Sequence, residues 1–360
     1  MRGTRGRVIH VESTAELDRR LDAGARRLGS WRVHRLDLSG RGSELMSREV
    51  HGAAFLGCTF EPGEDDRLTA AGALVMPAVG DSPLDVYRPR LYTADELFDR
   101  TPYPRSLDAR AYAWAQRAPD RDDSLAAALH DHAIDEALAR FTPGHRVVGV
   151  MGGHALGRDQ PAYADTARLG HALGSSLLVA TGGGPGAMEA ANLGGRLADL
   201  DVAALDAALA VLAGVPSYRP SIDAWVANAR AAVADLPTPR PSLGIPTWHY
   251  GHEPPNLFAT AIAKYVRNAV REAVLLEICD AGIVFLPGAA GTLQEVFQDA
   301  CENYYTEETS VAPMVLVGRE HWTTTLPAWP LLRSLARDRA MEEHVHLVDT
   351  VEEAAEVLLG

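Results

Sequence analysis

The sequence predicts an α/β protein built on a doubly wound parallel sheet, preceded by a smaller α+β region. From residue 124 onward, short apolar runs alternate with stretches of helical periodicity, which is the pattern of a parallel sheet covered by helices on both faces. Two of these runs lead into glycine-bearing segments that precede a helix, at 182–186 and 287–291. A chain of 360 residues with 47% hydrophobic content is long enough for one large domain and a second, smaller one.

Composition excludes several classes of protein. The formal charge of −14 argues against a broad basic surface, so no nucleic-acid partner is expected. The sequence contains neither a signal-peptide core nor a membrane span, which predicts a cytoplasmic protein with no membrane partner. Cys58, Cys279 and Cys301 are far apart and lack CxxC spacing; this favours reduced thiols over disulfides, and no metal site is expected. Lys264 is the only lysine, so any lysine-dependent chemistry would need it.

Residues 1–105 form the predicted N-terminal region, whose role the sequence does not reveal. A helix is predicted over 14–28, where Glu16 and Asp18 fall in the first turn. Three short runs separated by glycine, proline and acidic clusters predict strands, at 33–38, 53–60 and 73–76. The proline-rich and acidic stretch 101–123 is the predicted boundary.

Residues 124–360 form the predicted nucleotide-binding domain. Short apolar runs predict strands at 146–151, 177–181, 282–286, 314–317 and 346–348. Helical periodicity and capping signals predict helices at 124–141, 163–173, 187–197, 257–279, 292–304 and 351–359. The stretch 199–241 reads as one or two helices and a proline-rich connection, inserted over the sheet.

The first glycine loop follows a strand directly at 182–186. In an open parallel sheet, ligands bind at the carboxyl ends of the strands, beside helix N-termini. Glycine lets the backbone approach an anion closely and tolerates positive φ. Taken alone, this loop is better explained as a tight strand-to-helix turn than as an anion site. His154, after an earlier strand, would line the same cleft or act as a satisfied polar residue in a turn.

The second loop, Pro287–Gly291, joins a buried strand to a helix whose expected N-cap is Thr292. The threonine hydroxyl and the first free N–H groups of that helix suit a phosphate. Glu295 follows three residues later, so Thr292 and Glu295 also match a capping box. For Glu295 alone, that structural role fits as well as a catalytic one.

The helix predicted at 257–279 carries three positively charged residues. Lys264, Arg267 and Arg271 are spaced for one helical face in an acidic protein. Like charges at i, i+4 destabilise a helix by about 0.2–0.5 kcal/mol unless something compensates. An anionic ligand would compensate, and so would acidic residues elsewhere in the fold.

The two glycine motifs together resemble the LOG family, whose members are often mislabelled lysine decarboxylases. The resembling segments are GGGPGAMEAAN at 182–192 and PGAAGTLQE at 287–295, and the resemblance extends over about residues 140–350. The segment EPPN at 253–256 and the arginines after it further resemble the larger bacterial branch, the nucleotide 5′-monophosphate nucleosidases. This resemblance implies a Rossmann-like fold and a homodimer or higher homo-oligomer.

The resemblance also implies an activity, cleavage of the N-glycosidic bond of a nucleoside 5′-monophosphate to free base and ribose 5-phosphate. Carried over by motif, the catalytic residues are Arg271 and Glu295. No cofactor is expected. The residues expected to bind substrate and phosphate are Gly152, Gly153, Gly183, Gly184, Gly186, Met188, Glu253, Asn256, Arg267, Gly288, Ala289, Ala290, Gly291 and Thr292.

Two departures and two alternatives accompany this prediction. Ala289 replaces the usual second glycine of the later motif and disfavours positive φ there. The insertion at 199–241 is longer than in plant-like members, which favours a general nucleotide activity over cytokinin activation. The alternative function is a non-catalytic nucleotide-binding sensor or regulatory module. Decarboxylation with pyridoxal phosphate would need Lys264 as a Schiff base, which a lysine among arginines suits poorly.

Overall fold

The computed structural model describes residues 8–249, 251, 253–307 and 310–360, so the first seven residues of the predicted N-terminal region lie outside the described part. The chain divides into two compact units, Met1–Arg90 with Ala118–Ala137, and Leu91–Arg117 with Leu138–Gly360. The helix α6 (Arg121–Phe141) begins in the first unit and ends in the second.

The described part of the first unit contains a four-stranded parallel sheet in the order β1-β2-β3-β4. Its elements are β1 (Ile9–Val11), α1 (Thr14–Asp22), β2 (Trp31–His34), α2 (Gly42–Met46), β3 (Ala54–Leu56), α3 (Glu64–Ala70) and β4 (Leu74–Met76). The register places Val11 beside Val33, Val33 beside Phe55, and Phe55 beside Val75. These side chains contribute to one hydrophobic cluster.

This unit differs from the α+β region expected from the sequence. Its strands are all parallel and alternate with helices, so it is an α/β unit too. The strands hold only three or four residues each, and runs this short do not reveal whether their neighbours run parallel or antiparallel. The strands predicted at 53–60 and 73–76 are present in shorter form, and the one predicted at 33–38 is displaced to 31–34. The strand β1 was not predicted.

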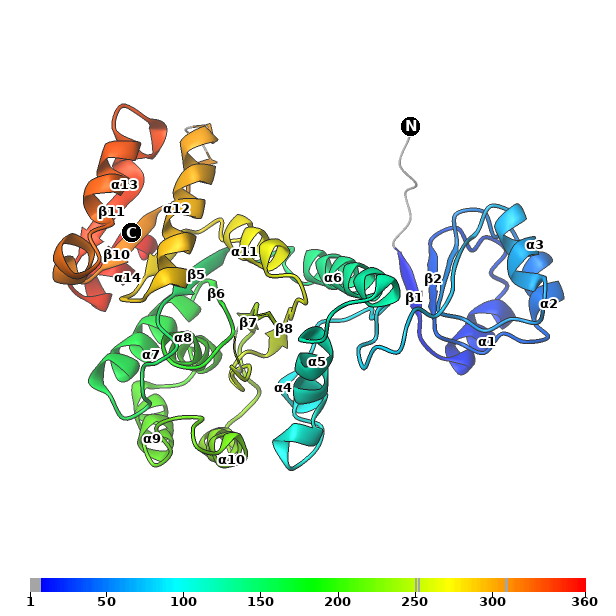
Figure 1. Cartoon of the computed structure of the whole chain (residues 1–360), viewed down its shortest axis with the longest axis horizontal. Coiled ribbons are helices and arrows are strands. Elements are labelled where there is room, and N and C mark those ends of the chain that lie inside the picture. The colour runs from blue at the N-terminus through cyan, green and yellow to red at the C-terminus, as the bar shows by residue number, and fades with distance from the viewer. Residues whose placement is uncertain (1–7, 250, 252, 308–309) are drawn as a thin grey trace. The chain divides into compact units, whose positions relative to one another are not determined.

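The second unit carries the larger sheet (Figure 1). Its elements after α6 are β5 (Val147–Met151), α7 (Pro161–Gly174), β6 (Leu178–Thr181), α8 (Ala187–Arg196), α9 (Val202–Leu212), α10 (Ile222–Val233), β7 (Ser242–Gly244), β8 (Ala261–Ile262), α11 (Asn268–Glu277), β9 (Ile283–Phe285), α12 (Ala290–Tyr305), β10 (Met314–Val317), η3 (His321–Thr325), α13 (Trp329–Ala336), η4 (Ala340–His344), β11 (Val345–Val348) and α14 (Val351–Leu359). Three short elements precede α6, namely α4 (Ala94–Leu97), η1 (Tyr103–Arg105) and α5 (Leu107–Ala115).

The strand order confirms the predicted doubly wound sheet. In the described residues the seven strands run β11-β10-β9-β5-β6-β7-β8, and every pairing between neighbours is parallel. The chain therefore proceeds outward from β5 to β8 and then returns to the other side of β5 as β9. In open α/β sheets, such a reversal places the ligand crevice at the carboxyl ends of the strands on either side of it.

Close helix packing keeps the glycine-rich α8 against the sheet. α7 and α8 lie side by side (Figure 1), and a Cβ on Gly194 would collide with the Ala167 carbonyl oxygen. A Cβ on Gly195 would lie 2.9 Å from the Val179 Cβ of β6. The helix that follows the first glycine loop is thus held rigidly at the end of β6.

The helix predicted over 257–279 is wrong in its first half. Residues 261–262 form the edge strand β8 beside β7, and the helix α11 begins only at Asn268. Before β8 the chain bends just after Asn256, whose Oδ1 accepts the N–H groups of Phe258 and Ala259 at 3.0 and 3.1 Å. Short apolar runs do not distinguish a buried strand from a buried helix by periodicity.

As a result, the predicted arginine-bearing helical face does not exist. Lys264 precedes α11, and Arg267 is the exposed N-cap residue of that helix. Of the three residues, only Arg271 lies within α11, where it is buried. Lys264 is also buried, but it lies outside this helix.

Candidate functional site

The first glycine loop, Gly182–Gly186, is buried and follows β6 directly. Gly183 and Gly186 have φ values of +71° and +73°, which other L residues rarely adopt. Gly182 has no positive φ, but a Cβ on it would collide with the Arg271 guanidinium. Gly183 and Gly186 are therefore required by their backbone conformation, whereas a side chain at 182 would have to displace the Arg271 guanidinium or the Met188 side chain.

Asn256 holds this loop in place. Its backbone N–H donates to Gly183 O at 2.8 Å, and its side-chain Nδ2 donates to Gly184 O at 3.1 Å and to Asn192 Oδ1 at 2.9 Å. Asn256 is fully buried, and protein groups use its whole amide. The structure thus gives this predicted substrate-binding residue a place behind the loop, where it shapes the backbone.

The second loop, Pro287–Gly291, is largely exposed at the end of β9 and leads into α12. The predicted N-cap at Thr292 is wrong, because α12 begins at Ala290 with Ala289 as its N-cap and has no side-chain cap bond. The capping box with Glu295 is consequently absent. The first N–H groups of α12 have no acceptor within the helix, so they are available to an anion beside the exposed Gly291.

Ala289 does not adopt the left-handed backbone that favours glycine. Its φ is −120°, a value that alanine adopts without the penalty of the left-handed region. Gly288 is needed for another reason, since a Cβ there would collide with the Thr292 side chain. The loop accommodates an alanine at 289 and requires the glycine at 288.

The loop after β5 joins the two glycine loops. Gly153 N–H donates to Pro287 O at 3.3 Å, and Gly153 O accepts the Ala187 N–H at 3.1 Å. A Cβ on the neighbouring Gly152 would lie 2.9 Å from Ala187 Cβ and 3.0 Å from Leu286 Cβ. The ends of β5, β6 and β9 therefore meet at the reversal of strand order.

Arg271 connects the first loop with α12. Its Nε donates to Ile245 O at 2.7 Å, and its Nη2 donates to Gly182 O at 3.4 Å. Its Nη1 lies 3.4 Å from Glu295 Oε1 and 2.8 Å from Glu272 Oε2. A guanidinium has five N–H donors, and most of them already face protein groups. Arg271 thus links Ile245 and Gly182 to the carboxyl groups of Glu272 and Glu295.

Glu295 is the perturbed carboxyl group of the site. Burial raises the pKa of Glu295 to about 7, the Arg271 guanidinium lowers it, and the Glu272 charge raises it further. Its exposed fraction is 8%. A buried carboxyl group whose pKa lies near neutral pH, beside one specific cation and at the strand ends, is typical of a catalytic base.

Glu272 is a member of this cluster that the sequence analysis missed. It is buried, and its Oε1 accepts from Asn268 Nδ2 at 3.2 Å. Its Oε2 forms an ion pair with Arg271, although the two groups do not have hydrogen-bond geometry. The available signal was an acidic residue directly after the arginine, four positions from an asparagine on the same helical face.

Of the other predicted binding residues, Met188 and Glu253 lie near the first loop. Met188 is half-buried and approaches both Gly182 and Gly184 closely enough that a Cβ on either would contact its side chain. Glu253 Oε1 lies 3.4 Å from His154 Nδ1, and both side chains are partly exposed. Arg267 is exposed.

Lys264 lies between β8 and α11, within a buried hydrogen-bond network of the same unit. Its Nζ is 2.7 Å from Asp108 Oδ1, which also accepts from Trp248 Nε1 at 2.8 Å, while Tyr103 OH donates to Asp108 Oδ2 at 2.6 Å. Burial lowers the pKa of Lys264, and the Asp108 charge opposes this shift. The lysine stabilises the packing of α5 and has no free amine for a Schiff base.

Asp299 lies one turn after Glu295 on α12 and gives a stability prediction. Burial and the Glu302 charge raise the pKa of Asp299 to about 8 from its ordinary 3.8. The native state keeps a proton that the unfolded chain loses, so stability falls as pH rises between these two values, by up to about 1.4 kcal/mol per pH unit. We expect Asp299→Asn to raise the melting temperature clearly at pH 8 and little at pH 4.

Thermal unfolding of both proteins across this pH range checks the prediction, with the exposed Asp235→Asn as control. A melting-temperature shift of equal size at pH 4 and pH 8 would contradict a neutral, buried Asp299.

The described residues also bear on membrane crossing and metal binding. Among the helices of the described residues, none combines the length and apolar character that a membrane crossing requires. In the same residues, no three His, Cys, Asp or Glu side chains gather as a metal site. The cytoplasmic location stays a prediction.

Comparison with known proteins concerns mainly the C-terminal part of the chain. The protein-family model described as "Possible lysine decarboxylase" matches residues 227–358, a range that includes Arg271, the second loop and Glu295. The resemblance to the LOG family is confirmed over this range. No curated protein matches the chain.

Solved structures similar to the chain include two molybdenum-cofactor proteins. The molybdenum cofactor binding protein of the phototrophic bacterium Rippkaea orientalis is 16% identical, with a TM-score of 0.36 over 60% of this chain and 97% of that one. The molybdenum cofactor carrier protein of Chlamydomonas reinhardtii is 16% identical, with a TM-score of 0.35 over 60% and 99%. At these TM-scores the similarity adds nothing to the fold assignment, which rests on the strand order.

Proposed function

We propose that this protein hydrolyses the N-glycosidic bond of nucleoside 5′-monophosphates to give free base and ribose 5-phosphate. The observation that carries the proposal is the buried Glu295 carboxyl group, held 3.4 Å from Arg271 at the ends of the central strands. The match of the family model to this region supports it. The homo-oligomer expected from the resemblance stays a prediction.

The phosphate would bind at the start of α12. Free N–H groups and the positive end of the helix dipole favour an anion there, and the exposed Gly291 leaves the approach open, since even an added Cβ would meet nothing within 4 Å. The ribose would then extend toward the first glycine loop and Glu295.

Glu295 would act on the attacking water. Cleavage at the anomeric carbon passes through an oxocarbenium-like transition state. The Glu295 carboxylate stabilises this positive charge while it orients and deprotonates the water. Arg271 would hold Glu295 in place from the side of Gly182, and its positive charge would favour the negative charge that develops on the leaving base.

The direct test is incubation with AMP, GMP, IMP, CMP and UMP, followed by chromatography for free base and an assay for ribose 5-phosphate. We expect release of both products from at least one nucleotide. Absence of free base from all five would overturn the proposal. Tight monophosphate binding without release, unchanged by Glu295→Gln, would instead identify the sensor or regulatory module.

The pH profile follows from the carboxyl group. Because the pKa of Glu295 is raised to about 7 and the base must be ionised, kcat/KM should climb through pH 7 and level off about one unit above it. The Glu272 charge raises this pKa, so Glu272→Gln should shift the rising limb to lower pH. Initial rates from pH 5 to 9 measure this shift. A rising limb that stays in place would show that Glu272 does not act on the ionising group.

A further inference from the structure

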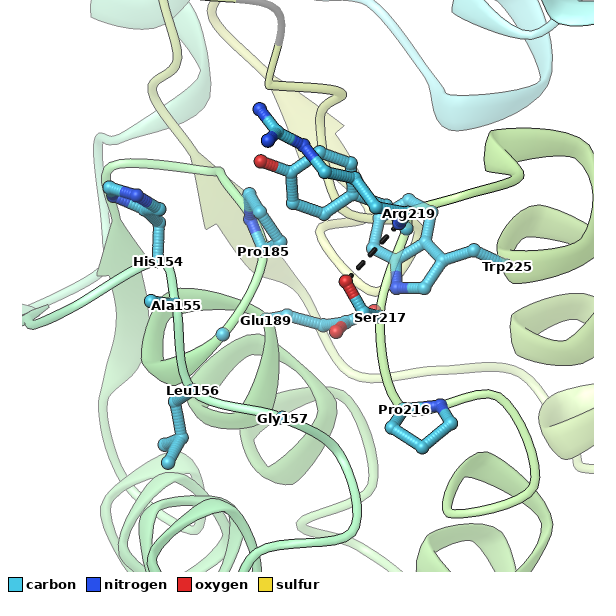
Figure 2. A pocket seen from close by; sticks show the side chains of 12 residues that line it. His154, Ala155, Leu156, Gly157, Pro185, Glu189, Pro216, Ser217, Arg219 and Trp225 are labelled. Atoms are coloured by element: carbon cyan, nitrogen blue, oxygen red, sulfur yellow. Dashed lines mark hydrogen bonds between the residues drawn. The ribbon is translucent and has the colours of Figure 1, made fainter.

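A cavity of about 260 Å³ lies beside the end of the first glycine loop, where Pro185 and Gly186 line it. The loop after β5 forms one wall, the first turn of α8 forms the floor, and the connection between α9 and α10 forms the opposite wall. Figure 2 shows His154 on one side, Arg219 and Trp225 on the other, and Glu189 between them. The predicted insertion therefore builds half of this cavity.

A buried arginine locks the insertion to the loop. Arg158 Nη2 lies 2.5 Å from Glu189 Oε1, and its Nη1 donates to Trp225 O at 3.2 Å and to Asn228 Oδ1 at 2.9 Å. Its backbone N–H donates to Pro216 O at 3.0 Å. The guanidinium also stacks over the Trp225 ring at 4.5 Å. The cavity is consequently preformed, which lowers the entropic cost of binding.

The wall supplied by the insertion suits a planar ring. Trp225 is buried under Arg158 and supports the partly exposed Tyr218 ring edge to face, with ring centroids 6.3 Å apart. The exposed Arg219 guanidinium lies 5.6 Å from the centroid of the Tyr218 ring. Aromatic and guanidinium planes bind heterocycles by stacking, and the Arg219 and His154 side chains offer hydrogen-bond donors to ring acceptors.

The cavity adjoins the predicted phosphate site. Gly153 bonds to Pro287 of the second loop, and the next residue, His154, lines the cavity. Pro185 and Gly186 of the first loop line it as well. Only one or two backbone residues therefore separate the second loop from the cavity. The base of a monophosphate bound at that loop can span this separation.

We infer that this cavity receives the heterocyclic base of the nucleoside monophosphate, and that Tyr218 and Arg219 of the insertion determine which base is accepted. This inference rests on the proposed function for the position of the phosphate. It assigns the insertion a role in base selection, separate from bond cleavage.

Calorimetric titration with AMP, GMP and ribose 5-phosphate tests the inference. The titrations use the full chain carrying Glu295→Gln, so that hydrolysis is slowed during the measurement. We expect Tyr218→Leu and Arg219→Ala each to weaken binding of at least one nucleotide about tenfold, the effect of losing one stacking contact. Binding of ribose 5-phosphate, which has no base, should not change. The matched controls are Tyr305→Leu and Arg337→Ala, which replace exposed residues that do not line the cavity.

The outcomes separate the two proposals. Unchanged nucleotide affinity in both variants overturns the base site, even if the wild-type protein releases base. Equal loss of nucleotide and ribose 5-phosphate binding also overturns it, since the cavity would then hold the sugar phosphate. Base-dependent loss of affinity in a protein that releases no base supports the cavity and overturns only hydrolysis.

Discussion

Replacement of Glu295 by glutamine is expected to lower kcat for base release by about 10²–10⁴-fold, the usual contribution of a general base. Glutamine keeps the size of the side chain and its contact with Arg271, but it cannot accept the proton of the attacking water. KM should change little, because the phosphate would bind to the backbone of the second loop. Steady-state assays on the best nucleotide measure both constants.

The matched control for this variant is Glu307→Gln, an exposed glutamate beyond the end of the same helix, which should leave both constants unchanged. A Glu295→Gln protein with wild-type kcat would remove Glu295 from the mechanism. A large rise in KM with constant kcat would place it in substrate binding instead.

Replacement of Lys264 by methionine is expected to lower the free energy of unfolding by about 3–5 kcal/mol, the cost of leaving a buried charge without its partner. Asp108 would remain almost fully buried, with only Tyr103 and Trp248 as donors among the partners described above. Urea unfolding followed by tryptophan fluorescence measures the loss.

The double variant Lys264→Met with Asp108→Leu distinguishes pairing from packing. It removes both charges, so most of the lost stability should return. A single variant that loses less than about 1 kcal/mol would show that the pair does not stabilise the fold. An unchanged loss in the double variant would assign the effect to packing.

Much of the larger unit could be predicted from the sequence because its signals are local. The runs that became β5 and β6 are apolar on both faces, as buried parallel strands require, and the glycine loops after β6 and β9 follow directly from the residue types. The helix at 351–359 has the bounds expected for it, since Thr350 and Glu353 form a capping box that is readable at three-residue spacing.

The errors occurred where local patterns are ambiguous. The run at 257–263 has the composition of a buried helix, but pairing with β7 made part of it a strand. Thr292 and Glu295 match the capping-box pattern equally well. The backbone nevertheless enters α12 at Ala290, and Glu295 turns toward Arg271 instead.

By itself, the sequence determined the alternation of strands and helices and the two glycine loops, because these depend on residue type and spacing along the chain. Arg271 and Glu295 became candidates through the resemblance that the two motifs carry. Only the tertiary structure decided that Glu272 joins this pair, that Asn256 supports the first loop, and that the insertion closes a cavity beside it. Each of these contacts joins residues whose distance in space and burial depend on the packing of the sheet and its helices. Burial is also what raises the pKa of Glu295, and no sequence pattern encodes the loss of water around one carboxyl group.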